Sequence, residues 1–205
     1  DPLKFLYAHN VTHLLIVSEE IGKYPAYSLI GSDKNYDRYS YINFMGLDRS
    51  LIQETRNGTT LVYTGGYPLD EDLTFGGSIY PKGTPVAGVF VPVENYFDEN
   101  GTVTGGIFKQ PSIVLSGKNC QGIQLSIKCI YADKLYTFEK YDYGGCVRIL
   151  PNVQNDKVDN IGAMVFLSRR VTDSLFGRLY LLEQASSYFK LVYSDQATTP
   201  IALYS

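Results

Sequence analysis

The sequence lacks several features that would assign a chain of 205 residues to a common functional class. No run of Lys or Arg occurs and the net charge is −3, which argues against nucleic acid as a partner. No apolar stretch approaches the roughly 20 residues that cross a bilayer, so we expect a soluble chain. Cys-x-x-Cys does not occur, and zinc or redox sites built on that motif are therefore excluded.

Trp is absent and Cys is scarce. The aromatic residues are 18 Tyr and 10 Phe. Tyr-rich surfaces suit recognition, because each ring combines a large contact area with a polar tip, and they equally suit a stable β-rich extracellular domain. The three cysteines, Cys120, Cys129 and Cys146, cannot all pair with one another. One disulfide and one buried thiol can form if the compartment is oxidising.

Residues 59–151 carry the pattern of a β-rich unit. Gly-Gly pairs and prolines punctuate this stretch and mark its turns. Between them lie short runs of β-forming residues at 60–64, 73–75, 86–93, 112–115, 123–131, 135–138 and 146–150. Several strands at this spacing predict a sandwich or a small barrel, and Ala132-Asp133-Lys134 predicts a hairpin turn between two of them.

The first part of the chain predicts a helix, a strand and a second helix. Asp1-Pro2 can begin a helix that ends at His9-Asn10. The apolar run 14–17 predicts a buried strand, since it is too short for a helix. A helix to Ile30 follows. Pro25 predicts that this helix is kinked or re-started there, because Pro lacks the N–H donor and crowds the preceding turn.

Outside the β-rich unit we expect further short elements: helices at 48–55, at 158–167 and from Thr172 or Asp173 to Leu182, and strands at 189–193 and 201–204. We therefore predict an α+β fold. A mixed helix/strand core is built from both chain ends, residues 1–58 plus 152–205. It carries residues 59–151 as a β-rich, sandwich- or barrel-like unit.

Glu20, Lys23 and Tyr27 are the candidate site residues of the second predicted helix. Their i, i+3, i+7 spacing places an acid, a base and a phenol on one helix face, since successive residues are rotated by roughly 100°. The same spacing fits a solvated charged pair beside a half-buried Tyr, which would contribute only about a few tenths of a kcal/mol. Spacing alone leaves both interpretations open.

Two other patterns name candidate residues. His9 and His13 have the spacing of a helical metal pair, but the predicted helix ends between them, so we expect surface or structural histidines. Asn-x-Thr triplets begin at Asn10, Asn57 and Asn100 and are N-glycosylation acceptors if the chain faces the outside of the cell. Asn-Gly is also a favoured turn pair. We expect Asn10 to be too buried for modification, which leaves Asn57 and Asn100.

The stretch from Thr12 to Ser32 resembles a conserved motif of a known enzyme family. A strand, a short turn and acid-x-x-Lys-x-x-x-large residue, running into Leu-Ile-Gly, is similar to the second conserved motif of the oligosaccharyltransferase catalytic subunit. The family pattern is Asp-x-x-Lys-x-x-x-Met or Ile. Here Glu20 stands for the Asp, Lys23 for the Lys and Tyr27 for the apolar residue, so two of the three positions differ from the pattern.

A second stretch resembles the end of the archaeal form of this subunit (the AglB type). The family has a helix carrying Arg-Leu-Tyr/His, a hairpin and a strand ending Tyr/Phe-x-Leu-Val-Tyr. The matching segments here are Arg178-Leu179-Tyr180 and Tyr188–Tyr193. The segment Tyr141–Gly145 looks like the family's first motif, Trp-Trp-Asp-Tyr-Gly, but it follows the acid-x-x-Lys helix and lacks Trp. We interpret it as a coincidence and expect the true motif upstream of Asp1.

The resemblance implies the soluble C-terminal domain of a membrane glycosyltransferase, on the extracellular face of the cell membrane. Such an enzyme transfers a lipid-linked oligosaccharide to Asn in Asn-x-Ser/Thr. The acceptor peptide is then the direct partner, and the lipid-linked oligosaccharide binds the missing membrane domain. A divalent metal, Mn or Mg, has its ligands outside this sequence, and this chain supplies no catalytic residue and no metal site. The isolated fragment is expected to be inactive.

Within that family interpretation the three candidate residues help to recognise the acceptor Ser/Thr. The stem of Lys23 forms an apolar wall beside the Thr methyl group. Glu20 orients Lys23 by an ion pair, and Tyr27 supports the floor of the pocket. The alternative is a non-catalytic extracellular module for binding or adhesion, which is β-rich and Tyr-rich and has no catalytic parent.

Overall fold

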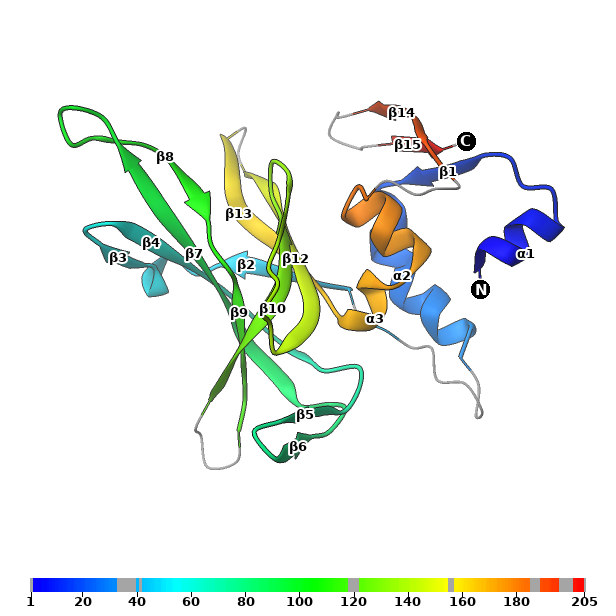
Figure 1. Cartoon of the computed structure of the whole chain (residues 1–205), viewed down its shortest axis with the longest axis horizontal. Coiled ribbons are helices and arrows are strands. Elements are labelled where there is room, and N and C mark those ends of the chain that lie inside the picture. Colours follow the sequence, from blue (N-terminus) through cyan, green and yellow to red (C-terminus); the bar gives the residue numbers. More distant parts are fainter. Residues whose placement is uncertain are drawn as a thin grey trace. The chain divides into compact units, whose positions relative to one another are not determined.

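The computed structural model describes residues 2–32, 40, 42–117, 122–154, 157–184, 189–195 and 201–204 (Figure 1). The chain divides into two compact units, one made of residues 1–42 with 170–205 and the other of residues 43–169. We describe each unit by itself.

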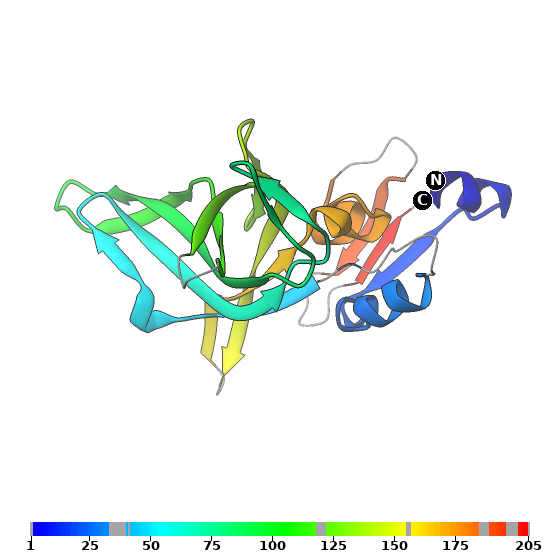
Figure 2. The ribbon, with the colours of Figure 1, turned by 90° about the horizontal axis from the view of Figure 1, so that it is seen from below.

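The larger unit is a seven-strand β-barrel (Figure 2). Its strands, in the order in which neighbours pair, are β4 (Gly58–Pro68), β2 (Ile42–Leu47), β13 (Lys157–Leu167), β12 (Tyr143–Gln154), β10 (Ile123–Tyr131), β9 (Ser112–Leu115) and β7 (Pro85–Phe97). Pairing of β7 with β4 closes the ring. The prediction of a β-rich barrel unit in the middle of the chain is confirmed.

Shorter strands extend the barrel at its edges. They are β3 (Gln53–Thr55) on β4, β8 (Val103–Phe108) on β7 and β11 (Leu135–Thr137) on β10. Strands β5 (Leu73–Phe75) and β6 (Ser78–Tyr80) pair with each other in a separate two-stranded sheet. The 3-10 helix η1 (Arg49–Leu51) precedes β3. The predicted hairpin turn at residues 132–134 is confirmed, since Tyr131 faces Leu135 across it.

Apolar side chains from alternate strand positions fill the barrel. Fully buried members include Val86, Val89, Leu125, Ile127 and Phe166. Strands β10 and β12 run parallel, in contrast to the antiparallel pairs on either side of them. Because parallel strands need a crossover rather than a tight hairpin, the ring cannot close by successive hairpins alone.

A disulfide joins these parallel strands. Cys129 and Cys146 are direct neighbours in the register, with Cα atoms 4.6 Å apart, and both are buried. The sequence left the pairing open. The third cysteine, Cys120, lies outside the described residues.

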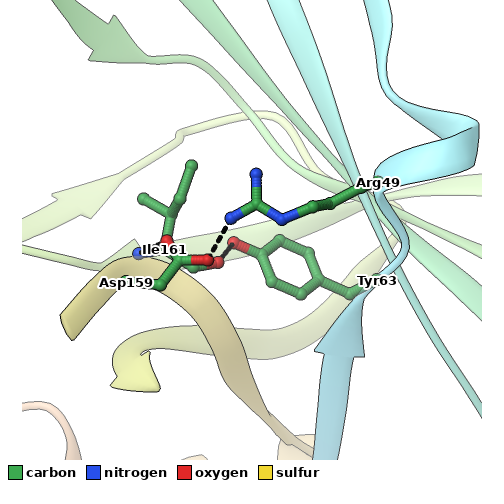
Figure 3. A network of polar contacts seen from close by, with 4 residues as sticks. All are labelled: Arg49, Tyr63, Asp159 and Ile161. Carbon is green, nitrogen blue, oxygen red and sulfur yellow. Dashed lines mark hydrogen bonds and ion pairs between the residues drawn. The ribbon is translucent and has the colours of Figure 1, made fainter. Parts of the chain in front are cut away.

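A polar network holds an irregular part of β13 (Figure 3). The register between β12 and β13 shifts after Leu150, which leaves the region of Ile161 out of step with the ladder. The buried Tyr63 hydroxyl of β4 donates to the Ile161 carbonyl at 2.7 Å, and Arg49 pairs with Asp159 beside it. The Tyr63 hydroxyl thus replaces the hydrogen bond that the Ile161 carbonyl lacks in the β12–β13 ladder, because backbone groups away from water need a partner.

The smaller unit combines both ends of the chain. Its helices are α1 (Pro2–Ala8), α2 (Glu19–Ile30), α3 (Arg169–Thr172), whose first residue belongs to the barrel unit, and a π-helix at Gly177–Leu181. Its three-stranded antiparallel sheet has the order β1 (Leu14–Val17), β15 (Ile201–Tyr204), β14 (Leu191–Asp195). The first strand of the chain therefore pairs with the last (Figure 1).

Two local predictions are wrong, and a third is decided only in part. Residues 158–167 form strand β13 rather than a helix, because pairing with β12 and β2 on both sides satisfies the backbone and buries Met164 and Phe166. Residues 48–55 are η1 and β3 rather than one helix. Helix α2 continues through Pro25, which excludes the re-start, and the kink at Pro25 stays a prediction.

The predicted helix/strand core built from residues 1–58 plus 152–205 is not supported. We expected residues 43–58 and 152–169 to belong to a helix/strand core, but their strands β2, β3, β4, β12 and β13 belong to the barrel unit. Their hydrogen-bond partners lie far away in the sequence, so local periodicity carries no information about the sheet they join.

Candidate functional site

Helix α2 follows strand β1 directly. Ser18 makes no side-chain capping bond. Instead the Glu20 carboxylate accepts from the backbone N–H of Val17, the last residue of β1, at 3.4 Å. Glu19 and Glu20 lie in the first turn, where the helix dipole favours negative charge. The helix ends at Gly31, whose N–H donates to the Tyr27 carbonyl at 3.0 Å.

The three candidate residues share one face of this continuous helix. Glu20 is half-buried, and the Lys23 side chain is 53% exposed and Tyr27 56% exposed. The helix has no buried residue at all. The acid, the base and the phenol are therefore accessible together, as their spacing predicts.

The expected ion pair between Glu20 and Lys23 is replaced by another. The Lys23 ammonium lies 3.6 Å from a Glu19 oxygen, in the i, i+4 arrangement. Glu20 is engaged at the Val17 N–H instead. The expected ion pair between Glu20 and Lys23 is therefore wrong, because the partner of Lys23 is Glu19. Both partners are largely exposed, so the pair stabilises the helix by no more than about 0.5 kcal/mol.

An aromatic stack holds α2 against the second half of its own unit. The Tyr24 ring stacks on Phe176 with centroids 5.3 Å apart, and Phe176 stacks on Tyr180 at 5.5 Å. Ser40 adds two contacts: its N–H donates to the Ser28 hydroxyl at 2.8 Å and its hydroxyl donates to the Tyr24 hydroxyl at 3.3 Å. These supports were not predicted. The apolar stripe at 175–182 signals a buried face but does not name Tyr24 as its partner.

The segment carrying Arg178-Leu179-Tyr180 is a π-helix. The Leu182 N–H donates to the Gly177 carbonyl at 2.9 Å, five residues back. Gly177 itself is required by close approach, because a Cβ there would lie 2.0 Å from the Val171 carbonyl oxygen. Leu179 and Tyr180 are buried and Arg178 is exposed. Two of the three residues of the Arg178-Leu179-Tyr180 segment thus pack inside the unit.

The other candidate residues do not gather into a site. The His9 ring lies tilted against the Phe5 ring with centroids 4.4 Å apart, and His13 is exposed, with Nδ1 3.0 Å from the Thr12 hydroxyl. Over the described ranges, no group of three or more His, Cys, Asp or Glu side chains could hold a metal ion. In the segment Tyr141–Gly145, Tyr143 lies in the barrel core, where its hydroxyl accepts from the Arg169 N–H at 3.1 Å.

The three Asn-x-Thr triplets lie in turns. Asn57 is exposed in the hairpin between β3 and β4, and Asn100 is exposed in the hairpin between β7 and β8. Asn10 follows α1 and is also exposed, with φ 53°. The expectation that Asn10 is too buried is therefore wrong.

Comparison with known proteins found no matching family model, no matching curated protein and no matching solved structure. None of the helices in the described part of the chain is long and apolar enough to cross a membrane. The interpretation of the site therefore rests on its own residues and their geometry.

Proposed function

We propose that this chain is the soluble C-terminal domain of a membrane oligosaccharyltransferase, the enzyme of protein N-glycosylation. Helix α2 contributes to the pocket that checks the Ser or Thr of the acceptor Asn-x-Ser/Thr. The observation that supports this proposal is the exposed face of α2, on which Glu20, Lys23 and Tyr27 project together directly after a strand. In the oligosaccharyltransferase family, the acid-x-x-Lys motif lies in a helix that follows a strand, and α2 has the same position after β1.

Recognition of Thr needs two kinds of contact. The hydroxyl needs a polar partner, and the methyl group needs an apolar wall. The stem of Lys23 has the length and flexibility to form such a wall while its ammonium stays solvated near Glu19. Glu19 rather than Glu20 then sets the direction of the stem. Tyr27 lies one turn further along and limits the floor of the pocket.

In this proposal, the metal ion and the lipid-linked oligosaccharide bind to the membrane domain of the enzyme, outside this chain. The family enzyme uses Mn or Mg to bind and orient the acceptor and the lipid phosphate. The described residues offer no set of ligands for such an ion, so they do not fit this role and we derive no step through it. The contribution of this chain is to bind and position the acceptor peptide.

Substitutions of Lys23 in the full-length enzyme test the proposal. Lys23→Ala removes the stem and should lower kcat/KM for Asn-x-Thr peptides about tenfold, with a smaller loss for Asn-x-Ser, since one methyl contact is worth about 1 kcal/mol. Lys23→Met keeps an apolar stem and should retain the preference for Thr. Lys190→Ala, at an exposed position of the same unit, is the control.

Two results would contradict this role. One is an equal loss of transfer to the Thr and Ser peptides in Lys23→Ala, which indicates a general structural defect. The other is an unchanged kcat/KM for both peptides in a variant whose thermal melting is also unchanged.

A second candidate is an extracellular β-rich module for binding or adhesion. The observation that favours it is a group of exposed aromatic and apolar residues on the β7–β8 hairpin, Tyr96, Phe97 and Val103. Exposed aromatic rings suit recognition of a partner or a glycan. The gene upstream of Asp1 separates the two candidates: several membrane-spanning segments support the transferase, and a signal peptide alone supports the module.

A further inference from the structure

The tip of the β7–β8 hairpin presents the triplet Asn100-Gly101-Thr102. The hairpin extends from the barrel, and every residue from Phe97 to Gly106 is exposed (Figure 1). Among the described residues, the structure records no hydrogen bond of the Asn100 amide group or of the Thr102 hydroxyl. Both side chains that define the acceptor triplet are therefore available to an enzyme.

Asp98 shapes this tip through four hydrogen bonds to backbone groups. Its N–H donates to the Thr102 carbonyl at 2.9 Å and its carbonyl accepts from the Gly101 N–H at 3.0 Å. Its carboxylate accepts from the N–H of Asn100 at 2.9 Å and from the N–H of Thr102 at 2.8 Å. Gly101 occupies the left-handed region, with φ 81°. These hydrogen bonds are exposed, so water replaces them when the tip changes conformation, at a net cost of about 1 kcal/mol each.

The triplet at Asn57 is held in place by a neighbouring strand. The Asn57 carbonyl accepts from the Asn95 N–H at 3.1 Å, and the Thr59 hydroxyl accepts from the Asn95 amide at 3.3 Å. A Cβ at Gly58 would lie 2.5 Å from the Val93 carbonyl oxygen, so the backbone runs directly against β7. Extraction of this triplet requires that β4 separate from both β3 and β7.

The triplet at Asn10 is exposed but engaged. The Asn10 N–H donates to the Tyr7 carbonyl at 3.1 Å, and the Val11 N–H donates to the Leu6 carbonyl at 3.0 Å. The Thr12 hydroxyl lies 3.0 Å from His13 Nδ1. Access to this acceptor therefore requires that the end of α1 unwind and that the Thr12 hydroxyl leave its partner.

The disulfide gives a separate indication of the compartment. The buried bond between Cys129 and Cys146 forms and persists in oxidising surroundings, such as the outside of a cell. N-glycans are attached on that side of the membrane.

We propose that Asn100 is the N-glycosylation site of the folded chain, in preference to Asn57 and Asn10. The donor is a lipid-linked oligosaccharide, and the enzyme is any oligosaccharyltransferase that meets the chain. The Asn100 amide nitrogen forms a bond to the anomeric carbon of the donor. The bond from that carbon to the lipid phosphate oxygen breaks, the phosphate leaves with the electron pair, and the amide loses one proton to a base of the enzyme.

This site treats the chain as a substrate and does not depend on the role proposed for α2. Its test uses an independent, purified single-subunit oligosaccharyltransferase with a lipid-linked oligosaccharide. Failure of transfer to Asn100 leaves the role of Lys23 untouched. Loss of the Lys23 effect likewise leaves Asn100 as an acceptor.

The experiment compares the folded chain with unfolded references. Peptides spanning residues 5–15, 52–62 and 95–105 serve as references for the three triplets, and glycopeptide mass spectrometry gives the initial rate at each Asn. We expect folding to lower the rate least at Asn100, since the hydrogen bonds of its tip are exposed and the structure records no partner for the Asn100 amide group or the Thr102 hydroxyl among the described residues. Relative to their own peptides, the rates at Asn57 and Asn10 should fall by at least about tenfold more than the rate at Asn100.

Matched substitutions complete the design. Thr102→Ala should abolish modification at Asn100 in the folded chain, and Thr59→Ala should leave modification at Asn100 unchanged. Modification at Asn57 as fast as at Asn100, a peptide 95–105 that accepts no glycan, or a folded chain that is unmodified at Asn100 while its peptide is modified would each overturn the proposal. Circular dichroism melting of every variant checks that the fold is retained.

Discussion

The Tyr24 ring stacks on the Phe176 ring with an interplanar angle of 22°, and this contact joins α2 to the segment that leads into the π-helix. Helix α2 has no buried residue, so it lacks the buried apolar stripe that normally fixes a helix. The stack, together with the hydrogen bonds of Ser40, therefore carries much of the attachment of the helix that presents Lys23.

Phe176→Ala should loosen α2 without unfolding the barrel unit. An aromatic pair contributes about 0.5–1.5 kcal/mol beyond the area it buries, so amide exchange in residues 19–30 should accelerate about tenfold. Phe97→Ala, which removes an exposed ring from the β7–β8 hairpin, is the control. Unchanged exchange in α2 would mean that the stack does not anchor it.

Tyr63→Phe should destabilise the barrel unit by about 1–3 kcal/mol. The substitution removes the Tyr63 hydroxyl, so the Ile161 carbonyl loses the hydrogen bond that this hydroxyl donates. Denaturant unfolding of the variant and of Tyr27→Phe, which removes an exposed hydroxyl, measures the difference. A loss equal to that of Tyr27→Phe would show that water satisfies the carbonyl.

Alkaline pH should destabilise the barrel unit above about pH 10. Burial raises the pKa of Tyr63 above its ordinary value, and the charge of Asp159 raises it further. Burial likewise raises the pKa of Tyr143, with a further contribution from Asp70. The unfolded chain loses these protons first, so the stability is complete below about pH 10 and is lost as the pH rises through the folded-state values.

The slope of this loss is about 1.4 kcal/mol per pH unit for each buried Tyr. Urea unfolding at a series of pH values between 9 and 12 should therefore show a decline that is about halved in Tyr63→Phe. A parallel decline in the variant and the parent chain would assign the effect to other groups.

The sequence predicts the barrel better than the remaining fold. The runs at 86–93 and 123–131 are strands, because β-branched residues between Gly and Pro breaks identify a strand locally. Strand β13 was predicted as a helix, because a short apolar run is compatible with either a buried strand or a buried helix. Closure of the ring through β4 and β7 depends on distant pairing that no local pattern encodes.

The same limit applies to the candidate site. The common face of Glu20, Lys23 and Tyr27 follows from helix geometry and could be predicted. The partner of Lys23 could not, because Glu19 and Glu20 both lie within reach of a flexible side chain. The stack of Tyr24 on Phe176 joins residues from opposite ends of the chain, which spacing cannot reveal.

Removal of the disulfide should cost about 3 kcal/mol. Cys129 and Cys146 are 17 residues apart, and closure of a loop of about this length in the unfolded chain corresponds to that free energy. The double variant Cys129→Ala with Cys146→Ala should unfold at correspondingly lower denaturant. Thiol labelling after unfolding without reductant should detect one thiol. Three labelled thiols would contradict the disulfide.

Arg169→Lys should destabilise the barrel unit by about 1 kcal/mol. The Arg169 guanidinium binds Glu71 through two nitrogens, at 2.9 and 2.6 Å, and a Lys ammonium cannot reproduce this planar pair. The Glu71 side chain is only 17% exposed, so its desolvation remains when one of the two bonds is lost. Exposure of Arg169 to solvent, at 58%, keeps the expected loss small.

Arg178→Lys is the matched control for this substitution. Its pair with Asp173 is 3.9 Å long and both side chains are exposed, so the free energy of unfolding should change by less than about 0.5 kcal/mol. Addition of 1 M NaCl should reduce the difference between Arg169→Lys and the parent chain only in part, because the Glu71 carboxylate is shielded from solvent. Equal unfolding free energies of the two variants would show that the bidentate geometry adds nothing to the exposed charge pair.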